Sequence, residues 1–194
     1  MASKFECEVR FEIKDIDGHV KKLKELNGTL KYLYEFTDYY YEPKSGKWNP
    51  TEKSLRIREW KNPQKPTQIF FVKNEIISSG GIEFKRVLYE EGKVSLYTGD
   101  ASLCRSLLDG LEFKEWLVVK KEKADFWSLP EQGFDTVYEY IDGVGWSGEL
   151  EFEGENPDEA REKIKKALEV LAITPELVSF KPVAALTAEK RGII

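Results

Sequence analysis

Histidine and cysteine are scarce in this 194-residue chain, and long apolar runs are missing. His19 is the only histidine, which nearly excludes a histidine-based metal site or catalytic triad. With Cys7 and Cys104 as the only cysteines, a disulfide framework is not expected, and a reducing, cytoplasmic location is the default. Charged residues interrupt the N-terminal segment, and no stretch is apolar for long enough to span a bilayer. We therefore expect neither a signal peptide nor a membrane partner.

Charged residues, by contrast, are abundant and of both signs. The 35 acidic and 30 basic residues give a formal net charge of −5, which argues against a duplex nucleic-acid partner, because such binders usually carry a basic face. Hydrophobic residues make up 41% and charged residues 34%, as in a soluble globular protein. The length fits one domain over 1–194, with a C-terminal helical tail over about 174–194.

Hydrophobic periodicity predicts an α+β fold with about eight strands. Helices are expected after Asp15 or Asp17, over 100–110, from Pro157 onward and near 183–190. The predicted strands cover 4–14, 29–42 (one strand or two), 54–60, 67–75, 82–90, 112–127, 134–142 and 147–153. A large antiparallel sheet of this kind tends to close into a barrel, because closure removes its exposed edges.

The charged residues of these strands alternate with apolar ones. Glu6, Glu8 and Arg10 share one face of the first strand, and Glu149, Glu151 and Glu153 share one face of the last. Basic pairs lie between them in the chain, at Arg56 and Arg58 and at Lys121 and Lys123. For any single strand, the ordinary interpretation is the solvent face of an antiparallel sheet.

The set of strands indicates more than a solvent face. If the sheet closes, the first and last strands become neighbours and the carboxylates of their two Glu-x-Glu pairs converge. Such a cluster is unfavourable unless a cation binds it, and oxygen ligands favour Mg²⁺ or Mn²⁺. The basic pairs suit a polyanion, since arginine matches phosphate oxygens. A metal ion and several bases around a chain of phosphates are the usual components of phosphoryl transfer.

Taken in chain order, these motifs resemble the CYTH or triphosphate tunnel metalloenzyme family, which includes class IV adenylyl cyclases, thiamine triphosphatases and inorganic triphosphatases. The family's opening Glu-x-Glu-x-Lys is similar to 6–10, its Leu-Arg-Ile-Arg strand to 55–58 and its closing Glu-x-Glu to 151–153. The resemblance covers roughly residues 4–182, and the other similar segments are 38–42, 69–73, 121–123 and 140–144.

The resemblance implies an eight-stranded antiparallel barrel that forms an open tunnel, with helices packed outside. The implied ligands of one or two Mg²⁺ or Mn²⁺ ions are Glu6, Glu8, Glu90, Glu151 and Glu153. The implied phosphate-binding residues are Arg10, Arg56, Arg58, Lys73, Arg86, Lys121 and Lys123. Tyr40 and Lys73 are the catalytic candidates, Tyr40 because it shares the face of Asp38 and would orient a water molecule.

The chain departs from the family pattern at three positions. Arg10 replaces a lysine, and because arginine is never deprotonated in proteins it can bind phosphate but cannot act as a base. Arg86, Leu88 and Glu90 share a face, so leucine replaces a glutamate there, unless the register differs by one residue and Lys85 points inward. Lys123 replaces the arginine of the late basic pair.

Three functions and one purely structural interpretation follow. The first is metal-dependent hydrolysis of a triphosphate-containing small molecule, namely tripolyphosphate, thiamine triphosphate or a nucleoside triphosphate. The second is a class IV type adenylyl cyclase, and the third is a non-catalytic binder of polyphosphate or nucleotide. The fourth is a barrel with a polar interior and no ligand. We expect a monomer or a homodimer.

Overall fold

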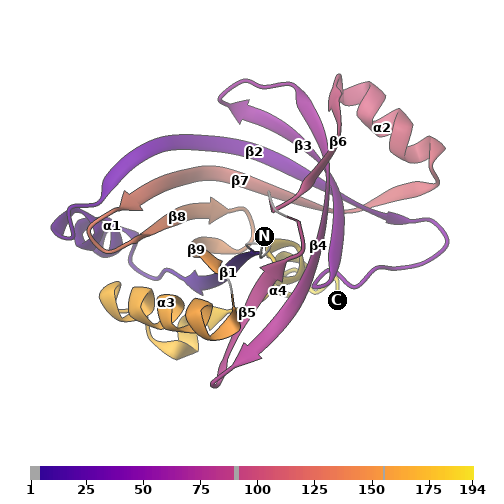
Figure 1. Cartoon of the computed structure of the whole chain (residues 1–194). Coiled ribbons are helices and arrows are strands. Elements are labelled where there is room, and N and C mark those ends of the chain that lie inside the picture. Colours follow the sequence, from indigo (N-terminus) through magenta and orange to yellow (C-terminus); the bar gives the residue numbers. More distant parts are fainter. Residues whose placement is uncertain (1–4, 90–91, 155) are drawn as a thin grey trace.

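The computed structural model describes residues 5–89, 92–154 and 156–194, without the side chains of 5, 6, 153 and 154. Eight strands form a closed antiparallel barrel (Figure 1), which confirms the predicted α+β barrel. Their order around the barrel is β1 (Phe5–Glu12), β5 (Ile82–Val87), β4 (Thr67–Ser79), β3 (Lys53–Asn62), β2 (Thr29–Pro43), β7 (Phe113–Leu129), β8 (Phe134–Ile141) and β9 (Gly145–Gly154). Pairing of β9 with β1 closes the barrel, so the first and last barrel strands are neighbours.

Two short strands extend the wall. β10 (Val178–Ser179) pairs with the second half of β1, and β6 (Val94–Gly99), which the sequence did not predict, pairs with the first part of β4. Four α-helices and a 3₁₀ turn (Pro175–Leu177) accompany the barrel among the residues described. The helices are α1 (Ile16–Glu25), α2 (Ala101–Gly110), α3 (Pro157–Val170) and α4 (Val183–Lys190). In this part of the chain, no helix is both long and apolar enough to cross a membrane.

Capping residues set where these helices begin, as the sequence predicts. Asp15 accepts a hydrogen bond from the Gly18 amide, and Asp100 accepts one from the Ser102 amide. Asn156 accepts one from the Glu159 amide, with Pro157 at the first helical position of α3.

The main apolar core lies outside the barrel wall, so the interior can hold many charged residues. Cys7, Val9 and Phe11 alternate along β1 and pack in one core cluster with Ala160 and Ile164 of α3. Burying this apolar face against the helices stabilises the wall. The intervening residues of β1 therefore point into the lumen.

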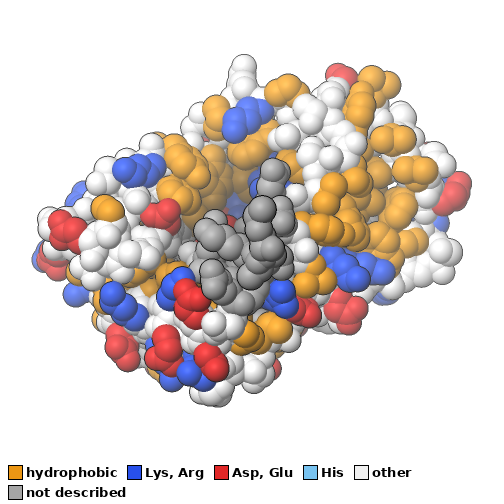
Figure 2. Space-filling view, viewed as in Figure 1, with side chains coloured by type: hydrophobic (Ala, Val, Ile, Leu, Met, Phe, Trp, Pro, Cys, Tyr) orange, Lys and Arg blue, Asp and Glu red, His pale blue; other side chains and the backbone are white. Residues whose placement is uncertain are grey.

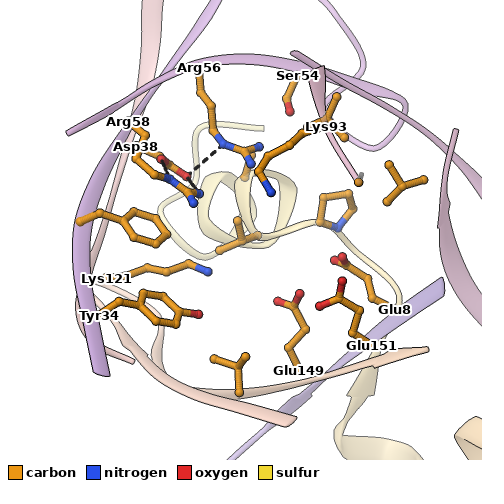
Figure 3. Close-up of a pocket in the computed structure, with 18 of the residues that line it drawn as sticks. Glu8, Tyr34, Asp38, Ser54, Arg56, Arg58, Lys93, Lys121, Glu149 and Glu151 are labelled. Atoms are coloured by element: carbon orange, nitrogen blue, oxygen red, sulfur yellow. Dashed lines mark hydrogen bonds and ion pairs between the residues drawn. The ribbon is translucent and has the colours of Figure 1, made fainter. Parts of the chain in front are cut away.

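Helix α4 covers one end of the lumen. Ala184 and Ala188 pack in a core cluster with Tyr40 of β2, and Pro182, Val183 and Ala184 line the cavity inside the barrel. Arg191 fixes the end of this helix, because its guanidinium donates to the backbone oxygens of Val118 and Asp142, each at 2.7 Å. Figure 3, a view along the lumen, shows a helix behind it. The barrel thus encloses the expected tunnel, and α4 lies over one of its ends.

Candidate functional site

A cavity of about 620 Å³ occupies the barrel, and all eight barrel strands contribute side chains to it. Two groups of its charged residues face each other across the cavity (Figure 3). We call Glu8, Glu149 and Glu151 the acidic wall, and Arg56, Arg58 and Lys121 the basic wall.

The acidic wall comes from the seam where the barrel closes. Glu8 of β1 lies directly opposite Glu151 of β9, and Arg10 lies opposite Glu149. Glu6 is likewise opposite Glu153 in the backbone register, although the side chains of both lie outside the described part of the structure. The two Glu-x-Glu pairs thus come together as the sequence predicts at the level of the backbone. Glu90 also lies outside the described residues.

The basic wall is organised around a buried aspartate. Asp38 of β2 is 1% exposed and accepts two hydrogen bonds from Arg58, from Nε and Nη2, each at 2.7 Å. Arg56 Nε lies 3.2 Å from Asp38 Oδ2. Burial alone would raise the pKa of Asp38, but the charges of Arg58 and Arg56 outweigh it and lower that pKa. Asp38 is therefore ionised and holds both guanidinium groups at the lumen.

A second buried network links the two walls. Glu139 of β8 is fully buried and lies 2.5 Å from both Arg10 Nη1 and Lys121 Nζ. Arg10 also forms an ion pair with Glu149. The sequence motifs did not identify Glu139. The available signal was a carboxylate between two tyrosines in a mostly buried strand.

Lys121 has an altered acidity in this network. Burial lowers its pKa to about 8, the attraction of Glu139 opposes that shift, and the charges of Arg10 and Arg58 add to it. The pKa of Glu139 is lowered, because Lys121 and Arg10 outweigh the effect of its burial. The charge of Lys121 therefore changes just above neutral pH.

The structure corrects the predicted register of β5. Lys85 and Val87 line the cavity, whereas Arg86 points away from it and pairs with Glu75 at 2.7 Å. Lys85 forms an ion pair with Glu8, its partner across the β1–β5 ladder. The alternative with Lys85 inside is thus the one adopted, and the lumen position next to it holds Val87 rather than Leu88.

Two predicted lysines also lie outside the lumen. Val72 and Asn74 line the cavity, so Lys73 between them points outward and is exposed, which removes it from both its predicted roles. Lys123 is exposed as well, because the ladder between β7 and β8 shifts register between Lys121 and Lys123. Such a bulge reverses the alternation of side chains, so the two lysines no longer share a face.

Tyr40 lies in the cavity wall near α4, as predicted from its position two residues after Asp38. It is 2% exposed, and the Arg56 guanidinium carbon lies 5.9 Å from its ring centroid. Burial raises the pKa of Tyr40 to about 12. Its hydroxyl is therefore protonated at neutral pH and can donate a hydrogen bond, but it cannot act as a base.

The acidic wall has the oxygen donors of a Mg²⁺ or Mn²⁺ site, but its described carboxylates do not converge on one point. Its described donors are all carboxylate oxygens, which these ions prefer. However, among the side chains that the structure describes, no three His, Cys, Asp or Glu residues form a group able to hold a metal ion. Glu8 is engaged by Lys85 and Glu149 by Arg10. A metal ion bound there would compete with these bases for their carboxylates.

Comparison with known proteins identifies relatives of this barrel. The CYTH domain model matches residues 4–177. A conserved hypothetical protein from Pyrococcus furiosus is 25% identical, with a TM-score of 0.71 over 93% of this chain and 99% of its own. A putative adenylate cyclase from Vibrio parahaemolyticus has a TM-score of 0.69 at 13% identity, over 96% of this chain and 99% of its own.

A putative adenylyl cyclase from Hippeastrum, described as having a dominant triphosphatase activity, also has a similar fold. Its TM-score is 0.64 at 15% identity, over 97% of this chain and 96% of its own. No curated protein matches the sequence.

Proposed function

Because the chain belongs to the CYTH domain family, we propose that it is a metal-dependent phosphohydrolase acting on a triphosphate-containing substrate. Inorganic tripolyphosphate, thiamine triphosphate and nucleoside triphosphates are the candidate substrates. The observation that carries the proposal is the division of the lumen into an acidic wall and a basic wall that face each other (Figure 3).

The basic wall is suited to hold the phosphates. Arg56 and Arg58 are kept in place by Asp38, so little side-chain entropy is lost when they bind a ligand. Planar guanidinium groups bind phosphate oxygens in bidentate fashion, and Lys121 adds a third positive charge beside them. Arg10 adds charge, but two of its nitrogens are already used by Glu139 and Glu149. We therefore propose that Arg10 mainly holds Glu139 and Glu149 in position.

The acidic wall would hold the metal through Glu8 and Glu151, with Glu6 and Glu153 next to them in the β1–β9 register. A bound Mg²⁺ or Mn²⁺ ion would supply charge neutralisation for the phosphate oxygens. In the proposed reaction water attacks the terminal phosphorus, the bond to the bridging oxygen breaks, and orthophosphate leaves. The basic wall stabilises the negative charge that develops on the phosphoryl oxygens and the leaving group.

Tyr40 is proposed to orient the attacking water by donating or accepting a hydrogen bond at the inner end of the cavity. Substitution Tyr40→Phe removes only the hydroxyl, so the ring packing against α4 is retained. We expect a fall in kcat of roughly tenfold to a hundredfold, the usual scale of one or two positioned hydrogen bonds. A Tyr40→Phe enzyme with normal kcat and KM would remove Tyr40 from the mechanism.

A substrate panel tests the proposal. Tripolyphosphate, thiamine triphosphate and ATP are incubated with Mg²⁺ or Mn²⁺, and orthophosphate, pyrophosphate and cyclic AMP are measured together. Orthophosphate release supports the hydrolase. Cyclic AMP and pyrophosphate from ATP would instead identify a cyclase, the class under which the putative Vibrio and Hippeastrum cyclases are named. Tight binding of tripolyphosphate without any product over hours would identify a non-catalytic binder.

A further inference from the structure

A row of aromatic side chains leads along the cavity from its exposed rim to the basic wall. Tyr32 of β2 stacks on Phe126 of β7 with ring centroids 4.7 Å apart and planes 7° apart. Tyr34 stacks on Phe36 in the same way, at 5.5 Å and 5°. Phe36 meets Trp60 of β3 edge to face at 5.2 Å. We call these five residues, all of which line the cavity, the aromatic wall.

The outer part of this wall is open to solvent. Tyr32 is 53% exposed although it lines the cavity, and its neighbour Leu33 is 51% exposed. Figure 2 shows apolar side chains at the edge of the hollow in the molecule. Tyr32 and Tyr40 are eight residues apart on one strand, so roughly 26 Å separate this rim from the end that α4 covers. The aromatic wall therefore borders the end of the lumen opposite α4.

The inner part of the wall is fixed to the phosphate-binding residues. The Arg58 guanidinium carbon lies 3.5 Å from the centroid of the Phe36 ring, and Lys121 Nζ lies 5.2 Å from it. A triphosphate held by the basic wall would therefore have the aromatic wall next to it, on the way out to the rim. Whatever group the triphosphate carries must lie along that path, because α4 covers the other end.

We infer that the aromatic wall is the subsite for a flat aromatic ring carried by the triphosphate ligand, with Tyr32 and Phe126 as the stacking platform. This inference rests on the proposed function and narrows its substrate class to ring-bearing triphosphates, as opposed to bare tripolyphosphate. Stacked rings bind other ring systems through their faces, and Tyr32 is exposed enough at the rim for a ligand ring to contact it. A nucleobase and the pyrimidine of thiamine share this chemistry.

Binding measurements on Tyr32 variants test the inference. Dissociation constants are measured by calorimetry for the slowly hydrolysed imido analogues of ATP, thiamine triphosphate and tripolyphosphate. Tyr32→Ala should weaken binding of a ring-bearing analogue by roughly tenfold, the scale of losing one base–aromatic stack. It should leave tripolyphosphate within about twofold of the wild type, because that ligand carries no ring to stack on Tyr32. Tyr32→Phe keeps the ring and should restore the lost affinity.

Tyr140→Ala is the matched control. Tyr140 is also a half-exposed tyrosine packed against another aromatic residue, Trp146, but it lies outside the cavity. The Tyr140→Ala substitution should therefore leave the dissociation constants of all three ligands unchanged. If Tyr32→Ala weakens binding of the ATP analogue alone, the ring that stacks on the wall is a nucleobase. If it weakens binding of the thiamine triphosphate analogue alone, the ring is that of thiamine.

Two results would overturn the inference while the proposed function stands. One is unchanged binding of both ring-bearing analogues to Tyr32→Ala, and the other is an equal loss for all three ligands. If the wild-type protein binds none of the three ligands in the presence of metal, the proposed function itself fails, and the inference fails with it.

Discussion

Glu139 should be the residue on which the stability of the barrel interior depends most. It is fully buried, and two cations, Arg10 and Lys121, lie 2.5 Å from its carboxylate oxygens. Removing one partner of a buried ion pair costs about 3–5 kcal/mol, because the remaining charge stays buried and uncompensated. In Glu139→Gln the amide oxygen can still accept one hydrogen bond. We therefore expect the lower end of that range, a loss of about 3 kcal/mol in the free energy of unfolding.

The loss should depend on pH in a defined direction. The pKa of Glu139 in the folded protein lies below its ordinary value of 4.5, so the unfolded chain binds the proton more readily. The stabilisation by the ionised carboxylate is then fully present above about pH 4.5 and is lost as the pH falls toward the lower, folded-state pKa. The difference between wild type and Glu139→Gln should accordingly be largest near neutral pH and shrink in acid.

Urea unfolding followed by tryptophan fluorescence measures this difference, since the chain has five tryptophans. With a urea slope of about 2–3 kcal/mol per molar, the midpoint should move down by roughly 1–1.5 M at pH 7. Asp135→Asn, an exposed carboxylate on the same strand, should shift it by no more than about 0.2 M. If Glu139→Gln shifts the urea midpoint as little as Asp135→Asn, and by the same amount at pH 4 and pH 7, Glu139 does not stabilise the fold through its ion pairs with Arg10 and Lys121.

Three further predictions concern the lumen and its wall. Arg56→Met should weaken tripolyphosphate binding in calorimetry by roughly tenfold to a hundredfold through loss of charge-assisted hydrogen bonds, whereas Arg86→Met, outside the cavity, should not. Lys121, with its pKa lowered to about 8, should make the affinity for tripolyphosphate fall as the pH rises above 8, because the bound polyanion favours the protonated lysine. Arginine stays charged at these pH values, so Lys121→Arg should abolish the fall in affinity above pH 8. If the variant shows the same fall, Lys121 is not the group that causes it. Gly148→Ala should destabilise the protein by about 1–3 kcal/mol in thermal unfolding, because its Cβ would lie 2.0 Å from the Phe11 ring, while Gly46→Ala, with no atom within 4 Å, should be close to neutral.

Strict alternation is the sequence feature that correctly predicted the fold and which side chains of β1 and β3 point into the lumen. In β1 every second residue is apolar, so one assignment of faces is possible, and it places Glu8 and Arg10 in the lumen. The same holds for Arg56 and Arg58, which are separated by one apolar residue. Closure of the barrel through β1 and β9 then followed from the need to remove sheet edges.

The errors occur where neighbouring residues are of the same type or where the ladder is irregular. Lys85 and Arg86 are adjacent bases, so the sequence cannot indicate which one points inward; the pairing of Glu8 with Lys85 decides it. The bulge that turns Lys123 outward depends on how β7 fits between β2 and β8, and no local pattern marks it. Strand β6 was missed because its residues are mostly exposed, which leaves only a weak apolar alternation.

Arg10 has a structural reason to be arginine. It projects from β1 at the seam of the barrel, and its two terminal nitrogens contact Glu139 of β8 and Glu149 of β9. A forked guanidinium can join two carboxylates on different strands, whereas a lysine has one nitrogen to offer. The cation that stands in the family's lysine position therefore ties three strands together and cannot take up a proton from water. Lys121 is held by the same Glu139, and its lowered pKa of about 8 means that, unlike Arg10, it changes its charge just above neutral pH.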